Sequence, residues 1–472
     1  MNVLLIRPPD PLQNLRLLSR TRPMNLAYLA AYLRKYGIRV RIIDYETTVF
    51  DERSFSRILQ QESFSILGVS CTTPTIVSGS KICAIAKIKC PEIATLVGGP
   101  HASALPEQTL EQFPPFDYLV FGEGEETLFK LCCAIRDRKT PTNIDGLAFR
   151  TRGTIIKNPA RKLIKDLDTI PFPARDLIDY RSRFGHSTRG FSNQTSSTEL
   201  FTSRGCPYGC NFCAIQTTFG KKVRFRSSIS IEEEIRLIKT KFRFKHIIVA
   251  DDTFTLKENH ALEICDIFRR SGIESWSCDT RADHISKKLL KAMKLSACQK
   301  IAFGVESGSQ RILDLNGKGL TVEQVERAVH WAKEAGIRYI EGNFIIGSHP
   351  TETIDDIQQT RKLLRSLPWS FVSIAVITPY PGTTIYHLMK EQGLLHKNIS
   401  WEDFMMFGKT PKWETLHFSA NDLLNLQKKL SREFYLRPDY IIKQLLSVKS
   451  WPDLFFWISS GGAYLKWYAK SG

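Results

Sequence analysis

Three cysteines stand at spacings of four and three in the stretch TSRGCPYGCNFC, residues 202–213, which begins inside an apolar run. Soft thiolate sulfurs in one compact loop suit an iron–sulfur cluster or zinc. A structural zinc site normally closes with a fourth cysteine or histidine, but the next ones are His246 and Cys265. We expect an iron–sulfur cluster with one open iron; zinc with a distant fourth ligand, or no metal, is the alternative. The three expected ligands are Cys206, Cys210 and Cys213.

The chain around and after these cysteines alternates short apolar runs with amphipathic stretches. This alternation predicts parallel strands joined by helices. Six such units fit a partial (β/α)6 barrel of the TIM type, whose active site lies at the carboxyl ends of the strands. The apolar runs are 200–203, 246–250, 275–279, 300–305, 338–346 and 371–378, and helical stretches include 230–241, 257–270, 321–335 and 352–366.

The first 135 residues show a similar alternation and predict a second α/β unit, a doubly wound, Rossmann-like domain. Ligands of such sheets bind outside the carboxyl ends of the strands, and glycine-rich or hydroxyl-rich turns follow several of the apolar runs here. The predicted strands are 3–6, 40–43, 65–70, 94–97 and 118–121, and the predicted helices are 24–36, 51–61, 76–88 and 124–136.

A chain of 472 residues exceeds the usual size of one hydrophobic core, so several domains are expected. We predict an N-terminal domain at 1–140 and a linker at 141–198 that contains a hairpin over 147–156. The barrel then spans 199–385, and a mainly helical C-terminal extension over 386–472 covers it.

The cysteine motif, with Phe212 before its third cysteine and a βα barrel around it, resembles the radical S-adenosylmethionine (SAM) superfamily. The resemblance implies that SAM chelates the open iron of a 4Fe-4S cluster and that its reductive cleavage yields a 5′-deoxyadenosyl radical. The acidic pair after the second barrel strand stands at the position where that family has a Gly-Gly-Glu-like motif, which recognises the SAM amine. The residues at this position differ from that motif. The implied SAM contacts are Phe212, Asp251, Asp252, Arg281, Glu306 and Ser307.

These contacts have simpler alternatives. An Asp-Asp pair also caps helices, and the Glu306-Ser307 pair could cap the helix that follows its strand. For Arg281, the contact that the resemblance implies is an ion pair with the SAM carboxylate. Two later segments, 342–347 and 378–383, resemble the part of the family's barrel near the adenine, and they are also compatible with ordinary turns.

The glycine-rich turns of the first domain resemble the cobalamin-binding domain found in one branch of the superfamily. Glycines permit positive φ and close backbone approach to a flat corrin. The Asp-x-His-x-x-Gly signature of a cobalt-ligating histidine is missing, so we expect no histidine below the cobalt, and His101 packs nearby instead. Glu123 could equally be an acid favoured near a helix N-terminus. The implied cobalamin contacts are Ser70, Thr72, Thr73, Gly98, Gly99, His101, Gly122, Glu123 and Gly124.

The net charge of +18 and the pI near 9.4 admit nucleic acid, an anionic substrate or an acidic membrane surface as partners. No nucleic-acid module or run of basic residues stands out, which disfavours tRNA. The chain shows no signal peptide and no apolar window long enough to span a bilayer, which predicts a cytoplasmic protein. The aromatic and basic segment 431–468 could cover the barrel or lie on a membrane surface.

The resemblance implies an enzyme that methylates an unactivated carbon with the deoxyadenosyl radical and methylcobalamin. Cyclisation, oxidation and rearrangement are alternatives within the same branch, and a non-catalytic corrinoid or redox sensor is an alternative outside it. A small-molecule or lipid-like substrate and an external electron donor such as flavodoxin or ferredoxin are the expected partners.

Overall fold

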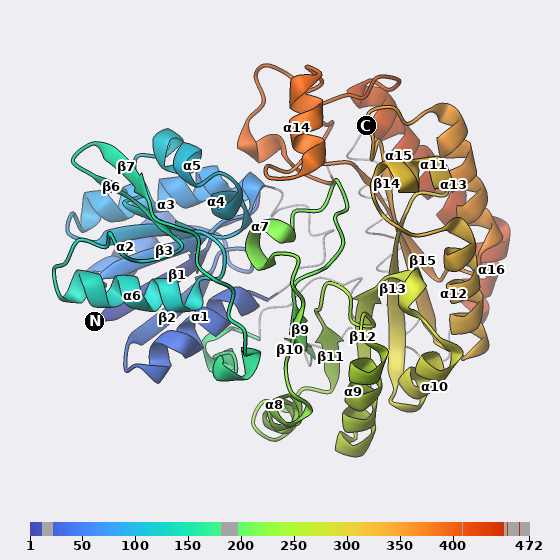
Figure 1. Cartoon of the computed structure of the whole chain (residues 1–472), viewed down its shortest axis with the longest axis horizontal. Helices are drawn as coiled ribbons and strands as arrows, with labels where there is room; N and C mark the ends of the chain where they lie inside the picture. The colour runs from blue at the N-terminus through green and yellow to red at the C-terminus, as the bar shows by residue number, and fades with distance from the viewer. Residues whose placement is uncertain (12–21, 181–196, 408, 448–450, 452–461, 463–472) are drawn as a thin grey trace.

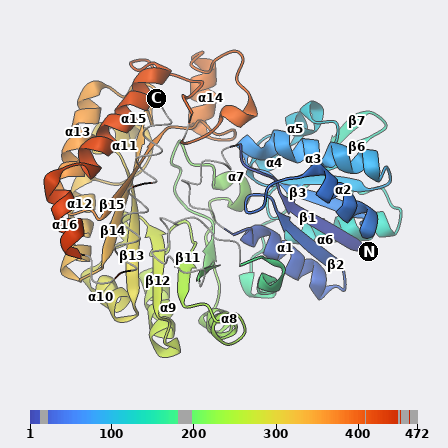
Figure 2. The ribbon, with the colours of Figure 1, turned by 180° about the vertical axis from the view of Figure 1, so that it is seen from behind.

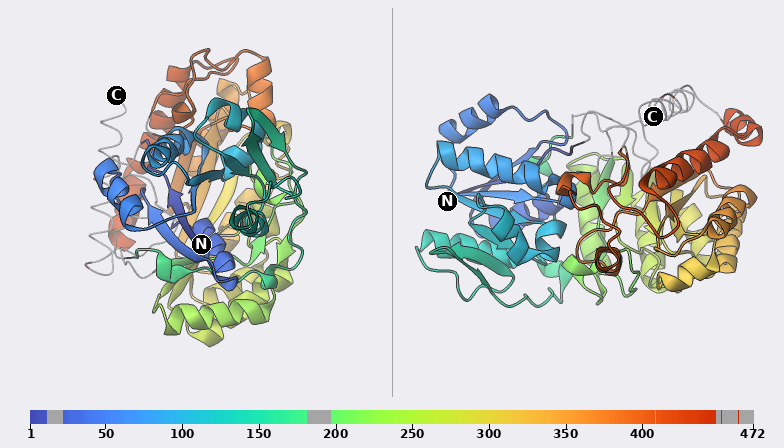
Figure 3. Two further views of the ribbon diagram at one scale, coloured as in Figure 1. Left: turned by 90° about the vertical axis from the view of Figure 1, so that its left-hand side faces the viewer. Right: turned by 90° about the horizontal axis from the view of Figure 1, so that it is seen from above.

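Two β-sheets, each covered by helices, lie side by side in the computed structural model (Figure 1). The structure describes residues 1–11, 22–180, 197–407, 409–447, 451 and 462. The view from behind keeps the two sheets side by side (Figure 2), and the view from above places the green segment that follows residue 200 between them (Figure 3).

The N-terminal sheet has the strand order β2-β1-β3-β4-β5-β6-β7, and its first five strands are parallel. The order of those five is that of flavodoxin-like doubly wound folds, in which ligands bind at the carboxyl edge beside the switch point between β1 and β3. The strands are β1 (Asn2–Arg7), β2 (Arg39–Asp44), β3 (Ile66–Ser70), β4 (Ala94–Gly98), β5 (Tyr118–Val120), β6 (Leu147–Thr151) and β7 (Thr154–Lys157).

Both faces of this sheet are buried because successive side chains of a strand point to opposite sides. In β1, Leu4 and Ile6 pack toward α2 and α3, whereas Val3 and Leu5 pack toward α1 and α6. This arrangement explains why the strands read as continuous apolar runs. The helices are α1 (Met24–Lys35), α2 (Glu52–Gln61), α3 (Ile76–Lys89), α4 (Pro100–Ala104), α5 (Pro106–Gln112) and α6 (Glu125–Arg136), with the short η2 (Thr73–Thr75) before α3.

The hairpin expected in the linker belongs to the N-terminal sheet. Strand β6 pairs antiparallel with β5, so that Ala148 lies opposite Leu119, and β7 pairs with β6. The sheet therefore continues to Lys157, past the boundary at residue 140 expected from the sequence, because β6 covers the edge of β5. The rest of the expected linker includes residues 181–196, which lie outside the described residues.

The second sheet has six parallel strands in the order β15-β14-β13-β12-β11-β8 and curves into a partial barrel with its helices outside (Figure 1). The predicted fold class is confirmed. The strands are β8 (Ser197–Leu200), β11 (His246–Val249), β12 (Ser275–Thr280), β13 (Cys298–Glu306), β14 (Tyr339–Ile346) and β15 (Phe371–Val376). The helices are α8 (Ser228–Thr240), α9 (Glu258–Ser271), α10 (Lys287–Leu295), α11 (Gln310–Leu315), α12 (Val322–Glu334) and α13 (Ile354–Ser366).

The largest core lies between the barrel strands and the outer helices, and it includes Trp276, Phe303 and Trp369. Side chains on the opposite face of the same strands point into the barrel. There Lys300 and Glu341 form a buried ion pair, so the interior of the barrel contains charged groups as well as apolar ones.

The C-terminal extension contacts both domains. Helix α15 packs on β14, β15 and α13, whereas η6 packs on η2 and α3 of the N-terminal domain. None of the helices in the described part of the chain combines the length and apolarity that crossing a bilayer requires. The end of the predicted extension, at 448–450, 452–461 and 463–472, lies outside the described residues. The elements are α14 (Thr384–Glu391), η6 (Trp401–Asp403), α15 (Ala420–Tyr435) and α16 (Pro438–Ser447).

Candidate cluster and cobalamin sites between the two sheets

The three cysteines lie on one loop at the carboxyl end of β8. The loop leaves the short strand β9 (Ser203–Arg204), includes α7 (Gln216–Phe219) and returns through β10 (Arg224–Phe225). Their thiols are free of disulfides; Cys206 and Cys210 are half-buried and Cys213 is exposed. Among the described residues, no group of three histidine, cysteine or acidic side chains already has the arrangement of a metal site.

The surroundings of the loop fit a cluster of thiolates. Burial raises the pKa of the Cys210 thiol, and the charges of Lys318 and Arg281 oppose that rise. The guanidinium of Arg281 stacks 3.6 Å above the ring of Tyr208, and its Nη1 is buried without a hydrogen-bond partner in the described structure. Two cations near the Cys210 thiol, one of them with an unused donor, suit both a thiolate and a ligand carboxylate.

Lys318 is a residue of the candidate site that the sequence did not single out. Its Nζ lies 5.9 Å from the ring centre of Phe212 and 2.8 Å from Glu306 Oε1. Glu306 ends β13 with a φ of +73°, a conformation rare for residues other than glycine. The lysine lies between Gly317 and Gly319, in a turn rather than at a strand end, so the alternation of strands and helices gave no signal for it.

The two neighbouring aspartates after β11 have different environments. Asp251 is buried and accepts hydrogen bonds from the N–H and hydroxyl of Thr202 and from the hydroxyl of Ser203. Asp252 is exposed, and partial desolvation together with repulsion by Asp251 raises its pKa to about 6. Of the pair, only Asp252 is available to an ammonium group, while Asp251 fixes the start of the cysteine loop.

Ser307 is engaged within the protein. Its hydroxyl lies 3.2 Å from Thr360 Oγ1 and accepts a hydrogen bond from the N–H of Ser309, the residue that precedes α11. The side chain is fully buried. Ser307 does not cap α11, whose N-cap residue is Ser309, but its hydroxyl is used by contacts within the protein, which leaves Glu306 as the candidate for SAM at this strand end.

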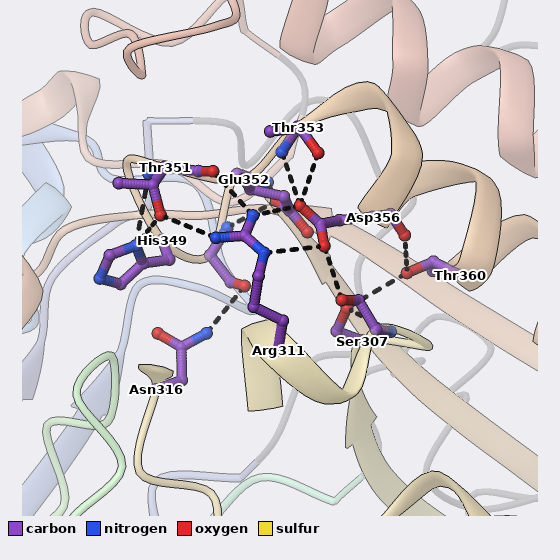
Figure 4. Close-up of polar contacts among 12 residues, drawn as sticks. Ser307, Arg311, Asn316, His349, Thr351, Glu352, Thr353, Asp356 and Thr360 are labelled. Carbon is purple, nitrogen blue, oxygen red and sulfur yellow. Dashed lines mark hydrogen bonds and ion pairs between the residues drawn. The ribbon is translucent and has the colours of Figure 1, made fainter. Parts of the chain in front are cut away.

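A polar network near the carboxyl end of β13 holds the loop after β14 (Figure 4). Arg311 pairs with Asp356 and donates to the carbonyl of Thr351 at 2.9 Å. Glu352 is fully buried and accepts hydrogen bonds from the N–H groups of Gly347 and Ser348. Burial raises the pKa of Glu352 to about 8.

Asn316 joins this network to the cysteine loop. Its side chain donates to Ser348 Oγ at 2.9 Å, and its carbonyl accepts from the N–H of Asn211 at 3.0 Å. The segment 342–347, which the sequence placed near the adenine, therefore continues into a loop that Glu352 and Asn316 tie to the cluster loop. The other such segment, 378–383, contains Gly382, where an added Cβ would lie 2.7 Å from Thr217 Cγ2 of α7.

Several residues expected to contact cobalamin gather at the carboxyl ends of β3 and β4. Ser70 Oγ accepts from Asn25 at 2.7 Å, and Thr72 caps η2. Gly99 has a φ of +105°, and a Cβ there would lie 2.5 Å from the carbonyl oxygen of Cys71. Gly99 thus allows the ends of β3 and β4 to approach each other at this edge of the sheet. At the same place the carbonyl of Gly98 accepts a hydrogen bond from the Cys71 N–H at 2.8 Å.

His101 is buried among protein groups. Its Nδ1 lies 3.4 Å from Thr73 Oγ1, and its ring packs edge-on against Trp401 of η6. Burial lowers the pKa of His101 to about 4, so the imidazole is neutral at pH 7. Its Nε2 has no partner in the described structure.

Glu123, expected to contact cobalamin, instead points toward the barrel. Its carboxylate pairs with Arg204 and Arg224 and accepts the N–H of Ile164 at 2.8 Å. Glu125 also pairs with Arg204. Gly122 and Gly124 on either side of Glu123 stay at the carboxyl edge of β5. Neither arginine was singled out in the sequence, because their partners lie 79 to 101 residues away.

Comparison with known proteins decides the family. A model of the B12 binding domain matches residues 15–131, and a model of the Radical SAM superfamily matches residues 200–364. The protein named Uncharacterized methyltransferase PH0819, from Pyrococcus horikoshii, is 32% identical over 447 residues, which are 94% of this chain and 95% of that protein. The chain is a cobalamin-dependent radical SAM enzyme.

Two further relatives of this radical SAM enzyme are informative. The anaerobic magnesium-protoporphyrin IX monomethyl ester cyclase of Rubrivivax gelatinosus is 28% identical over 394 residues, 82% of this chain and 69% of the cyclase. The structure of the methyltransferase TsrM from Kitasatospora setae, with cobalamin and a 4Fe-4S cluster bound, matches with a TM-score of 0.70 and 18% identity over 90% of each chain. The predicted family and its cofactors, SAM, a 4Fe-4S cluster and cobalamin, are confirmed.

Proposed function

We propose that this radical SAM enzyme is a methyltransferase that adds a methyl group to an unactivated carbon of a small molecule. The observation that carries the proposal is the place of the cysteine loop, whose helix α7 packs on α4 at the carboxyl edge of the N-terminal sheet. A cluster on this loop and a corrin at that edge would face a common space. The methyltransferase name of the Pyrococcus relative supports the same reaction.

The chain's own residues have distinct roles in this proposal. Cys206, Cys210 and Cys213 would hold the cluster, which would supply the one electron that cleaves SAM. Asp252 would accept a hydrogen bond from the SAM amine, and the unused Nη1 of Arg281 would donate one to the SAM carboxylate. Glu306 would accept hydrogen bonds from the ribose hydroxyls.

At the carboxyl edge of the N-terminal sheet, the loops after β3, β4 and β5 would bind the corrin. The neutral His101, whose ring packs edge-on against Trp401, would line the corrin site at this edge. The glycines at 98, 99, 122 and 124 let the backbone approach a flat ring closely.

A cyclase is the second candidate, because the Rubrivivax relative has that name and matches most of the chain. Growth with methionine that carries a trideuteromethyl group separates the two. A methyltransferase places that label in a metabolite that is absent from a deletion strain. A cyclase changes a metabolite without placing the label in it.

Replacing one cluster cysteine tests the enzyme itself. Anaerobically reconstituted protein with SAM and a strong reductant should release 5′-deoxyadenosine, whereas Cys210→Ala should release none and still bind cobalamin. Cys133→Ala is the matched control, since Cys133 is a partly buried free thiol on α6 outside the loop. Cleavage by the Cys210 variant at the wild-type rate would refute the assignment of the cluster.

The partners follow from the same proposal. The substrate is a small molecule, and an external reductant such as flavodoxin or ferredoxin supplies the electron. Helix α16 exposes Ile442, Leu445 and Leu446 to solvent beside Lys443. We assign to this face a peripheral contact with an acidic lipid surface, in a protein that otherwise stays in the cytoplasm.

A further inference from the structure

The loop that carries the three cysteines starts and ends at one two-stranded ribbon. Strand β9 pairs antiparallel with β10, so that Arg204 lies opposite Arg224. Residues 205–223 therefore form a closed loop with adjacent ends. A contact that holds this ribbon fixes both ends of the cysteine loop at once.

Both arginines of the ribbon reach into the N-terminal domain. Arg204 Nη1 lies 3.0 Å from Glu123 Oε1, and its Nη2 lies 2.6 Å from Glu125 Oε1. Arg224 Nη1 lies 2.8 Å from Glu123 Oε2 and donates to the carbonyl of Ile164 at 2.8 Å. Glu123 thus bridges the two strands of the ribbon, and Glu125 adds a second contact on one of them.

These ion pairs are shielded from water. The side chains of Glu123 and Glu125 are 1% and 5% exposed, and those of Arg204 and Arg224 are 10% and 3% exposed. Burial raises the pKa of Glu125, but the charge and hydrogen bond of Arg204 outweigh it and hold that pKa below its ordinary value. Without screening by solvent, removal of one partner leaves the other charge buried and unpaired.

The glutamates belong to the loop that also borders the cobalamin-binding edge. Gly122, which precedes Glu123, donates its N–H to Ser103 Oγ at 3.0 Å. Ser103 lies on α4, the helix that follows the Gly98-Gly99 turn and packs against α7. The loop after β5 is therefore tied to the edge on one side and to the ribbon on the other.

We propose that Glu123 and Glu125 are positioning residues that set the place of the cluster loop relative to the cobalamin-binding edge, through Arg204 and Arg224. This inference rests on the proposed function, because it assumes that both cofactors take part in one reaction. The two half-reactions differ in their dependence on that geometry.

Methylation of cobalamin by SAM requires the two cofactors to be close. The sulfur–methyl bond of SAM breaks, a cobalt–carbon bond forms with the electron pair of cob(I)alamin, and S-adenosylhomocysteine leaves. Reductive cleavage of SAM takes one electron from the cluster, breaks the bond from sulfur to the 5′ carbon and releases methionine. The second reaction needs the cluster alone, so a displaced cluster loop should affect the first reaction more.

The test compares Glu125→Gln, which removes one ion pair and keeps the shape, with the wild-type holoenzyme. We expect formation of methylcobalamin from SAM, with titanium(III) citrate as reductant, to fall about 100-fold, the effect of a misplacement near 1 Å. Release of 5′-deoxyadenosine should change less than about threefold. Glu125→Asp, which keeps the charge, should recover part of the methylation.

A second measurement needs no turnover. Dipolar coupling between cob(II)alamin and the reduced cluster, measured by pulsed electron paramagnetic resonance, should give a broader or shifted distance in Glu125→Gln. Glu126→Gln is the matched control, because Glu126 stands on the same turn of α6 and is 36% exposed, and its partners Lys130 and Arg161 lie outside the ribbon.

The outcomes separate this inference from the function on which it rests. An unchanged distance together with unchanged methylation in fully loaded Glu125→Gln would overturn the positioning role. Equal loss of both half-reactions at an unchanged distance would also overturn it, in favour of a merely structural contact. Wild-type protein that binds no cobalamin or does not cleave SAM would instead refute the proposed function.

Discussion

Glutamine in place of Glu352 should remove a pH dependence of stability that this buried carboxyl imposes. Its pKa rises from 4.5 to about 8 because burial penalises the charged form. A raised pKa means that the stability contributed by the protonated group is complete below pH 4.5 and is lost as the pH rises toward 8. Between pH 5 and pH 7, linkage gives a loss of about 2.5 kcal/mol from this group alone.

The magnitude converts into a melting temperature. An unfolding entropy of about 2.1 cal/mol/K for each residue gives about 1 kcal/mol/K for a chain of this size, so about 2.5 kcal/mol corresponds to about 2 to 3 °C. In the Glu352→Gln variant the new side-chain amide oxygen still accepts from the N–H groups of Gly347 and Ser348. We therefore expect the melting temperature of the variant, relative to that of the wild type, to rise by about 2 to 3 °C between pH 5 and pH 7.

Thermal melts of both proteins in matched buffers measure this difference. Subtracting the melting temperature of the wild type from that of the variant at each pH removes the contribution of all other groups. Glu391→Gln, an exposed change at the end of α14, is the control and should leave the difference near zero at each pH. A difference in melting temperature between Glu352→Gln and the wild type that stays constant from pH 5 to pH 7 would show that Glu352 is not a buried, protonated carboxyl.

Three more predictions, one of them with a control substitution, concern the candidate sites and helix α16. Asp252→Asn should weaken SAM binding at least tenfold, seen as a higher concentration of SAM needed to shift the cluster's electron paramagnetic resonance signal; an unchanged shift would exclude the amine contact. Gly99→Ala should cost more than about 2 kcal/mol and reduce cobalamin retention, because its Cβ would collide with Cys71. Gly153→Ala, at an open turn with positive φ, should lower stability by only about 1 kcal/mol and keep cobalamin. Leu446→Glu should abolish sedimentation with vesicles of acidic phospholipid; equal sedimentation would rule out contact through α16.

The strands of both domains could be predicted from the sequence because parallel strands buried on both faces leave continuous apolar runs. The first barrel strand was placed a few residues late, at 200–203, since β8 begins at Ser197 with the polar pair Ser197 and Thr198. The hairpin was recognised, but its membership of the N-terminal sheet depends on pairing with β5, which no local pattern encodes.

The candidate site was less predictable at the level of single side chains. The cysteine spacing is a local signal, so the candidate cluster ligands could be named from the sequence. Asp251 and Asp252 are adjacent and chemically identical, and only the tertiary contact with Thr202 separates their roles. Glu123 lies in a glycine-rich turn that suggests a ligand, yet its partners Arg204 and Arg224 come from another domain.

The contact between η6 and the N-terminal domain also constrains the order of assembly. Trp401 donates to Gln112, from which 289 residues separate it, and it covers His101 at the cobalamin edge. During synthesis the N-terminal domain leaves the ribosome first and folds as a unit, whereas this aromatic cover arrives only after the whole barrel. We expect the edge to stay open to a bulky corrinoid throughout that interval, so that loading during translation would be easier than loading of the finished chain.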